Sequence, residues 1–217
     1  YEFRLSLVGS EMCIRDRLYD IPYMLTVPNM TVAAPKDGTE MLGLLRAAVE
    51  HTEGPFCFRY PRDASPDVPL AMAEIAATPY GTWEVLRKGR DVAILAVGTM
   101  VGTALAAAEA LAAEGLEVTV VNCRYLKPYD EVTLAAILAD HSHILTVEEG
   151  VATNGFGAYM AAIIHRQSPH VRTAVHGVPD KIIYAAPRKK QLASLGLDAA
   201  GIAERVRALR DSEALAG

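Results

Sequence analysis

Several features that mark secreted, membrane-spanning and nucleic-acid-binding proteins are scarce in this sequence. The 217 residues include only three cysteines, an odd and widely spaced set that predicts neither a disulfide framework nor a metal cluster and is typical of a reducing cytosol. No apolar run approaches the roughly 18–20 residues needed to span a bilayer. The formal net charge of -5 disfavours a broad nucleic-acid-binding face, so any anion site must be local. We therefore expect a cytoplasmic protein that binds neither a membrane nor a nucleic acid.

Common catalytic and metal-binding signatures are also missing. None of the six histidines has the HExxH or Cys-x-x-Cys context of a zinc site, and no serine lies in a G-x-S-x-G elbow. Gly98-Thr99-Met100 lacks the full G-x-G-x-x-G spacing, so an ordinary turn is favoured over an anion site. The segment from Gly150 to Gly157 lacks the Lys-Ser/Thr ending of a phosphate loop. We expect Asn154 and these glycines to cap the following helix and to allow close packing.

Two adjacent carboxylates, Glu148 and Glu149, lie at the end of a predicted strand, where a general base could sit. Neighbouring side chains on a strand point to opposite faces, however, and make a poor acid–base pair. A structural or interface role is therefore favoured for both.

The composition, with 51% hydrophobic and 22% charged residues, is that of a globular protein. From residue 18 onward, short apolar runs alternate with helical patterns, which predicts an α/β fold with a doubly wound, mostly parallel sheet. Strands are expected at 30–34, 56–58, 83–86 (an edge strand), 91–97, 117–122, 144–147 and 171–175. A helix is expected from an Asp37/Glu40 cap to about residue 51, and a loop or short helix before residue 30. Further helices are expected at 101–114, at 130–139, from the glycine-rich segment to about residue 166, at 189–195 and at 198–209.

The ends and joints of the chain are marked by composition. Residues 1–17 contain EMCIRDR, which lacks a clear period and resembles a translated sequencing adaptor, so we expect a non-native or disordered lead. The first residue is Tyr rather than Met, and we expect that the natural amino terminus is missing. Residues 66–80 hold three prolines among small residues, which predicts a linker between two parts of the chain.

The stretch GPFCFRYPRD offers the best anion-binding site in the sequence. Phe56-Cys57-Phe58 is typical of a buried strand of a parallel sheet, and Arg59 and Arg62 lie at its downstream end. Ligands of open α/β sheets bind outside the carboxyl ends of the strands, and a guanidinium there can hold a phosphate or carboxylate through two parallel hydrogen bonds. Surface ion pairs with Asp63 and Asp67 are equally compatible with the local sequence.

Six segments together resemble the thiamine-diphosphate-dependent 1-deoxy-D-xylulose-5-phosphate synthases. They occur in the family's order and spacing, and RYPR is the most diagnostic of the motifs they contain. The glycine-containing segment is shared more loosely with transketolases and with beta-type subunits of 2-oxo-acid dehydrogenases. The segments are YDIPYMLTVPNM (19–30), GPFCFRYPR (54–62), RYLKPYD (124–130), VEEGVATNGFGA (147–158), VPDKII (178–183) and LGLDAAGI (195–202).

The resemblance implies a carboxy-terminal fragment of a homodimeric enzyme. Residues 18–65 correspond to the end of a pyrimidine-binding domain, residues 66–80 to a linker, and residues 81–217 to a transketolase-like carboxy-terminal domain. Such enzymes decarboxylate pyruvate on thiamine diphosphate and add the resulting carbanion to D-glyceraldehyde 3-phosphate. The product, 1-deoxy-D-xylulose 5-phosphate, is a precursor of isoprenoids, thiamine and pyridoxal.

The resemblance also assigns site residues. Arg62 matches the arginine that holds the phosphate of the aldehyde, and Arg59 is the weaker candidate, which supports the site or pairs structurally. Asp20 and Tyr23 match a segment that lines the approach to the pocket. Three departures from the family pattern put the substrate in doubt. Asp63 replaces a glycine, Leu25 stands where an arginine is common, and Tyr-Ala-Ala-Pro at 184–187 replaces a turn that contains histidine and glycine.

Other family motifs are absent from the sequence. It has no G-D-G…N segment to hold the cofactor's diphosphate and Mg²⁺, no activating glutamate and no histidine region before Tyr19. We therefore expect the chain alone to be inactive, and we expect its strand 56–58 to lack neighbours. Two alternatives stay open: a split transketolase or 2-oxo-acid dehydrogenase subunit completed by another chain, and a non-catalytic α/β dimerisation module.

Overall fold

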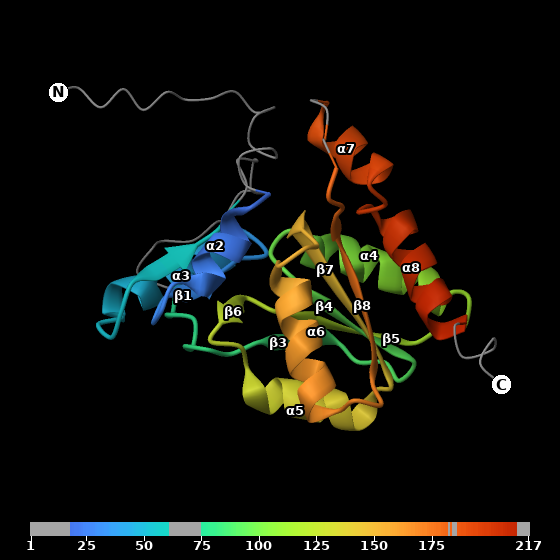
Figure 1. Ribbon diagram of the computed structural model, residues 1–217, viewed down its shortest axis with the longest axis horizontal. Helices are drawn as coiled ribbons and strands as arrows, with labels where there is room; N and C mark the ends of the chain where they lie inside the picture. The colour runs from blue at the N-terminus through green and yellow to red at the C-terminus, as the bar shows by residue number, and fades with distance from the viewer. Residues whose placement is uncertain (1–17, 61–74, 182, 184–185, 212–217) are drawn as a thin grey trace.

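The computed structural model describes residues 18–60, 75–181, 183 and 186–211 (Figure 1). Its elements form a three-stranded sheet of order β2-β1-β6 and a five-stranded sheet of order β3-β5-β4-β7-β8. In chain order they are α2 (Asp20–Thr26), β1 (Thr31–Ala33), α3 (Gly38–Glu50), β2 (Phe56–Phe58), β3 (Glu84–Arg87), β4 (Val92–Ala96), α4 (Met100–Ala112), β5 (Val118–Asn122), β6 (Tyr125–Lys127), α5 (Glu131–Asp140), β7 (His143–Val151), α6 (Phe156–Gln167), β8 (Arg172–Val178), α7 (Arg188–Ser194) and α8 (Ala199–Asp211).

The five-stranded sheet has helices on both faces. Strands β5, β4, β7 and β8 are parallel, and β3 joins β5 at one edge in the antiparallel direction. Side chains along β4 alternate between two apolar clusters. Val92 and Ile94 pack with residues of α4 and α8, whereas Ala93 and Leu95 pack with residues of α5 and α6. The predicted doubly wound, mostly parallel sheet is therefore confirmed.

The three-stranded sheet combines strands from distant parts of the chain. β1 and β2 are parallel and joined by α3, as the predicted βαβ unit requires, with Val32 opposite Cys57. β6, which closely follows β5 in the sequence, pairs antiparallel with β1. The expectation that strand 56–58 lacks neighbours is therefore wrong, because β2 pairs with β1 along its whole length. Within the described residues β2 is an edge strand and half-buried, so the prediction of a buried strand there is also wrong. Sequence reasoning missed β6 because three residues are too few to show a period.

Buried polar contacts also connect the two parts of the chain. Asp37 caps α3 by accepting a hydrogen bond from the Glu40 amide at 2.8 Å, as the sequence predicts. The buried Glu40 carboxylate accepts from the Lys36 amide at 2.7 Å and from Asn122 Nδ2, at the end of β5, also at 2.7 Å. Lys36 Nζ in turn lies 3.0 Å from a carboxylate oxygen of Glu84 in β3. The start of α3 is thus fixed against the five-stranded sheet.

The apolar core on the α5 and α6 side extends into the first part of the chain. Ile21 and Val32 belong to the same buried cluster as Trp83 and Phe156. The indole N–H of Trp83 donates to the Tyr125 carbonyl in β6 at 2.7 Å, so its only polar atom is satisfied. Residues on either side of the predicted linker therefore share one core, which sets the geometry between the two sheets.

Candidate functional site

The carboxyl ends of β4 and β7 meet where a doubly wound sheet forms its ligand crevice. These strands are neighbours, and the helices that follow them, α4 and α6, pack on opposite faces of the sheet. Such a change of direction is the usual position of a binding site in an open α/β sheet. Thr99, at the start of α4, and Glu149, in β7, border the crevice. Gly98 between β4 and α4 has a φ of 57°, which a glycine adopts without strain.

The chain's own Arg188, the first residue of α7, lies at this position. Its Nε donates to Glu149 Oε1 at 2.9 Å and its Nη2 to Glu149 Oε2 at 2.6 Å, a bidentate pair. The same Nη2 donates to Thr99 Oγ1 at 3.0 Å, and the Thr99 hydroxyl donates to Glu149 at 3.1 Å. We name Thr99, Glu149 and Arg188 the crevice cluster. It binds α7 to the carboxyl edge of the sheet.

Arg59 lies beside this cluster and contacts another of the predicted site residues. Its Nε donates to Asp20 Oδ2 at 2.8 Å, and its Nη2 donates to the backbone carbonyl of Glu149 at 2.9 Å. Its own amide donates to the Ala33 carbonyl of β1 at 2.8 Å. The structure thus brings together Asp20 and Arg59, which are 39 positions apart. These contacts show the pairing role that the sequence allowed for Arg59, whereas phosphate binding by Arg59 stays a prediction.

Arg62, the strongest predicted phosphate ligand, lies outside the described residues, as do Asp63 and Asp67. The predicted role of Arg62 and the alternative surface ion pairs therefore stay predictions. Of the departures from the family pattern, Tyr184 and Ala185 also lie outside the described part of the chain.

Glu148 is fully buried at the amino terminus of α6. Its carboxylate accepts from the amides of Phe156 at 3.1 Å and Gly157 at 2.8 Å, two donors that a helix start leaves without intrahelical partners. Burial raises the pKa of Glu148 to about 7, an effect that these hydrogen bonds and the charge of Arg59 partly offset. Glu148 and Glu149 thus have separate structural partners, as expected for neighbours on a strand. Asn154 and the glycines of this segment were expected to cap α6. The N-cap is Gly155, so the expectation is right for a glycine and wrong for Asn154, because the N-cap residue provides no side-chain hydrogen bond.

Gly155 is required by the tight packing around Glu148, and its replacement provides a stability prediction. A Cβ at this position would meet the Val151 carbonyl oxygen and lie 2.6 Å from Glu148 Oε1. Gly155→Ala should therefore lower the free energy of unfolding by about 1–3 kcal/mol or more in urea denaturation. Gly102→Ala in α4 is the matched control, since nothing lies within 4 Å of its Cβ. That change should raise stability by about 0.5–1 kcal/mol; equal effects of the two substitutions would contradict the packing argument.

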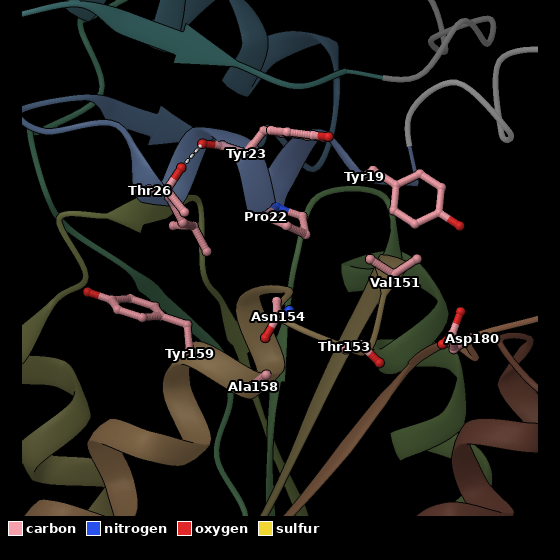
Figure 2. Close-up of a pocket in the computed structure, with 11 residues that line it drawn as sticks. Tyr19, Pro22, Tyr23, Thr26, Val151, Thr153, Asn154, Ala158, Tyr159 and Asp180 are labelled. Carbon is pink, nitrogen blue, oxygen red and sulfur yellow. Dashed lines mark hydrogen bonds between the residues drawn. The ribbon is translucent and has the colours of Figure 1, made fainter.

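An open groove of about 730 Å³ lies between α2 and the start of α6 (Figure 2). Tyr19, Tyr23 and Thr26 line one side, and Asn154 and Tyr159 line the other. Tyr23 is 71% exposed, and its carbonyl accepts a hydrogen bond from the Thr26 hydroxyl at 2.7 Å. Tyr23 therefore lines a pocket, although its assignment to the approach of a substrate stays a prediction. Asp20, which was assigned to the same approach, accepts a hydrogen bond from Arg59 Nε instead.

The metal-ligating and cationic side chains of the described ranges bear on a site for a metal–diphosphate group. Within those ranges, no three His, Cys, Asp or Glu side chains are placed to hold a metal ion. Among the described guanidinium groups at the carboxyl edges, Arg59, Arg124 and Arg188 each contact a carboxylate of the chain itself. No helix in the described ranges is long and apolar enough to cross a membrane.

Sequence reasoning missed the crevice cluster. Thr99 was assigned to an ordinary turn, Glu149 to an unspecified structural role, and Arg188 was not singled out. No local pattern connects these three residues, because their contacts depend on how β4, β7 and α7 come together. The order of strands in the sheet is the one signal that could have indicated the position of the crevice.

Curated relatives of the chain are 1-deoxy-D-xylulose-5-phosphate synthases. The synthase of Synechococcus sp. (strain JA-2-3B'a(2-13)) is 39% identical over 214 residues, which cover 99% of this chain and 33% of the relative. That of Microcystis aeruginosa is 38% identical over 203 residues, covering 94% of this chain and 32% of the relative. The chain thus spans about a third of the length of these relatives.

A solved structure and two family models agree with this similarity. The structure described as "Split gene transketolase, inactive beta4 tetramer" aligns with a TM-score of 0.80 at 30% identity, covering 89% of this chain and 62% of the other. Residues 13–67 match the transketolase pyrimidine binding domain, and residues 81–202 match the transketolase C-terminal domain. The chain therefore belongs to the transketolase family.

Proposed function

We propose that this chain is the carboxy-terminal part of a 1-deoxy-D-xylulose-5-phosphate synthase. The reaction would condense pyruvate with D-glyceraldehyde 3-phosphate and release CO2. The observation that carries the proposal is that synthase relatives align with 94–99% of the chain at 38–39% identity. The RYPR motif, which follows β2 in the sequence, supports it, because an arginine after such a strand suits a phosphorylated substrate.

The cofactor implied by this function is thiamine diphosphate with Mg²⁺. When bound, thiamine diphosphate supplies the electron sink that stabilises the carbanion formed from pyruvate. We assign its metal–diphosphate group to sequence that the relatives carry beyond the length of this chain, because no three His, Cys, Asp or Glu side chains in the described ranges are placed to hold a metal ion. No step through the cofactor is assigned to residues 18–211.

The contribution proposed for this chain is to bind and orient the phosphorylated aldehyde. Arg62 and Arg59 would supply positive charge at the carboxyl end of β2, and Tyr23 would line the approach. The Asp20 carboxylate, 2.8 Å from Arg59 Nε, orients that guanidinium. This division of roles agrees with the many structural contacts of Arg59, which leave Arg62 as the main phosphate ligand.

The proposed enzyme is a cytoplasmic homodimer. Self-association is supported by the similar solved structure, which is described as a beta4 tetramer. The large exposed apolar side chains of the segment that contains α2, those of Tyr19, Tyr23 and Val27, are suited to such a contact.

An activity assay on two proteins tests the proposal. We expect the full-length gene product, with pyruvate, D-glyceraldehyde 3-phosphate, thiamine diphosphate and Mg²⁺, to form 1-deoxy-D-xylulose 5-phosphate, and the 217-residue chain alone to form none. Product formation by the isolated chain would contradict the assignment of the cofactor site to other sequence. Absence of product with the full-length protein would overturn the proposed function.

The second proposal is that this chain is one subunit of a split transketolase. It is favoured by the similarity to the solved structure of a split gene transketolase, which covers 89% of this chain. In that case the chain should gain transketolase activity only when mixed with a separately encoded subunit that carries the diphosphate-binding region. A chain that folds and dimerises without any affinity for thiamine diphosphate, alone or in such a mixture, would instead indicate a non-catalytic dimerisation module.

A further inference from the structure

Glu149 connects the two parts of the chain through both its backbone and its side chain. Its carbonyl accepts from Arg59 Nη2 at 2.9 Å, while its carboxylate accepts from Arg188 and Thr99. The contacts therefore run without interruption from Asp20 through Arg59 and Glu149 to the start of α7. Every one of these residues lies at the carboxyl edge of a sheet or at the start of a helix.

A comparison with a second bidentate pair shows that the crevice cluster is more than a surface ion pair. Arg207 in α8 and Glu114 after α4 have nearly the same geometry, with donor–acceptor distances of 2.7 and 2.9 Å, but their side chains are 42% and 47% exposed. The Glu149 side chain is only 9% exposed, and that of Arg188 is 31% exposed. A buried carboxylate loses much more when its cation is removed than an exposed one does.

We infer that Glu149 and Arg188 are positioning residues for Arg59, and through it for the phosphate of the substrate. The inference rests on the proposed function. By holding the Glu149 carboxylate from two sides, Arg188 and Thr99 fix the end of β7, and with it the carbonyl that accepts from Arg59. The guanidinium of Arg59 is then held in one orientation by this carbonyl and by Asp20.

Removal of Arg188 should loosen this arrangement. The Glu149 carboxylate would keep Thr99 as its remaining side-chain partner in the cluster and would tend to turn toward water or toward Arg59. Either movement shifts the carbonyl that orients Arg59. A displacement of about 1 Å in a binding group can lower activity by up to about 100-fold, so the effect should be visible in binding.

The test compares Arg188→Ala with the wild type in the full-length protein. Inorganic phosphate serves as the binding probe, with its dissociation constant measured from the rise in Tm that it produces. We expect this constant and the KM for D-glyceraldehyde 3-phosphate to rise about tenfold or more in the variant. The KM for pyruvate should not change. Arg207→Ala is the matched control and should change neither constant.

Each outcome decides the inference. If Arg188→Ala lowers Tm but leaves phosphate affinity and the aldehyde KM unchanged, the cluster is merely structural and the inference fails. The inference also fails if phosphate does not stabilise the wild type. If the wild type binds phosphate in an Arg188-dependent way yet makes no deoxyxylulose phosphate, the inference holds and the proposed function fails. If Arg188→Ala does not fold, Arg188→Lys is measured instead. The lysine keeps the charge but cannot form the bidentate contact, so the dissociation constant for phosphate and the KM for the aldehyde should again rise.

Discussion

Replacing Arg62 with alanine in the full-length protein should weaken the binding of D-glyceraldehyde 3-phosphate by roughly 2–5 kcal/mol. Each charge-assisted hydrogen bond to phosphate contributes about 1.5–3 kcal/mol, and a guanidinium can form two of them. The loss should raise the KM for the phosphorylated aldehyde and leave that for pyruvate unchanged, because pyruvate carries no phosphate. Steady-state kinetics with each substrate varied in turn would measure both effects.

Two comparisons separate this role from a structural one. Unphosphorylated D-glyceraldehyde should be used equally well by the wild type and by Arg62→Ala, and an equal loss with both acceptors would contradict the assignment. Arg59→Ala should both raise the KM for the aldehyde and lower Tm, because it also removes the hydrogen bonds to Asp20 and to the Glu149 carbonyl. A variant of Arg62 with the same drop in Tm and no selective change in KM would place Arg62 among the structural residues.

Most helices and strands could be predicted from the sequence because their apolar patterns are regular. The Asp37 cap, the βαβ unit of β1, α3 and β2, and the edge position of β3 all follow from local signals, and the structure confirms them. β7 is longer than predicted. The expected strand ends at Val147, where the apolar run stops, whereas the observed strand continues through Glu148 and Glu149 to Val151. Polar residues can continue a buried strand there because both carboxylates have partners.

The candidate site was predictable only in part, since its contacts join residues that are far apart in the sequence. Asp20 and Arg59 could be singled out as members of separate motifs, but nothing in either motif indicates that the two side chains lie 2.8 Å apart. Arg188 lies near the start of a predicted helix and has no local mark of function. Its role follows from the pairing of β4 with β7 and from the position of α7 against them, which a pattern of apolar residues does not specify.

The stability of the protein should fall with rising pH because of Glu148. The ordinary pKa of a glutamate, 4.5, applies to the unfolded chain, whereas burial raises the pKa of Glu148 to about 7 in the folded protein. Between these values the folded state binds more protons than the unfolded state, so the free energy of unfolding decreases as pH rises. The contribution is fully present below about pH 4.5 and is lost as pH rises through about 7. The difference between the two pKa values corresponds to about 3 kcal/mol.

The prediction is checked by urea unfolding of wild type and Glu148→Gln between pH 5 and pH 8, the range over which Glu148 should change charge. The glutamine does not titrate, so the difference in stability between the two proteins should change by about 2.5 kcal/mol across this range. His176, whose pKa is lowered chiefly by burial, acts in the opposite direction but is present in both proteins and cancels in the difference. Glutamine has one acceptor oxygen where the carboxylate has two, so one amide at the start of α6 loses its partner. This loss lowers the free energy of unfolding equally at every pH and does not change its dependence on pH. A difference that is independent of pH would show that Glu148 is already ionised at pH 5, and that the amides of α6 and the charge of Arg59 outweigh its burial.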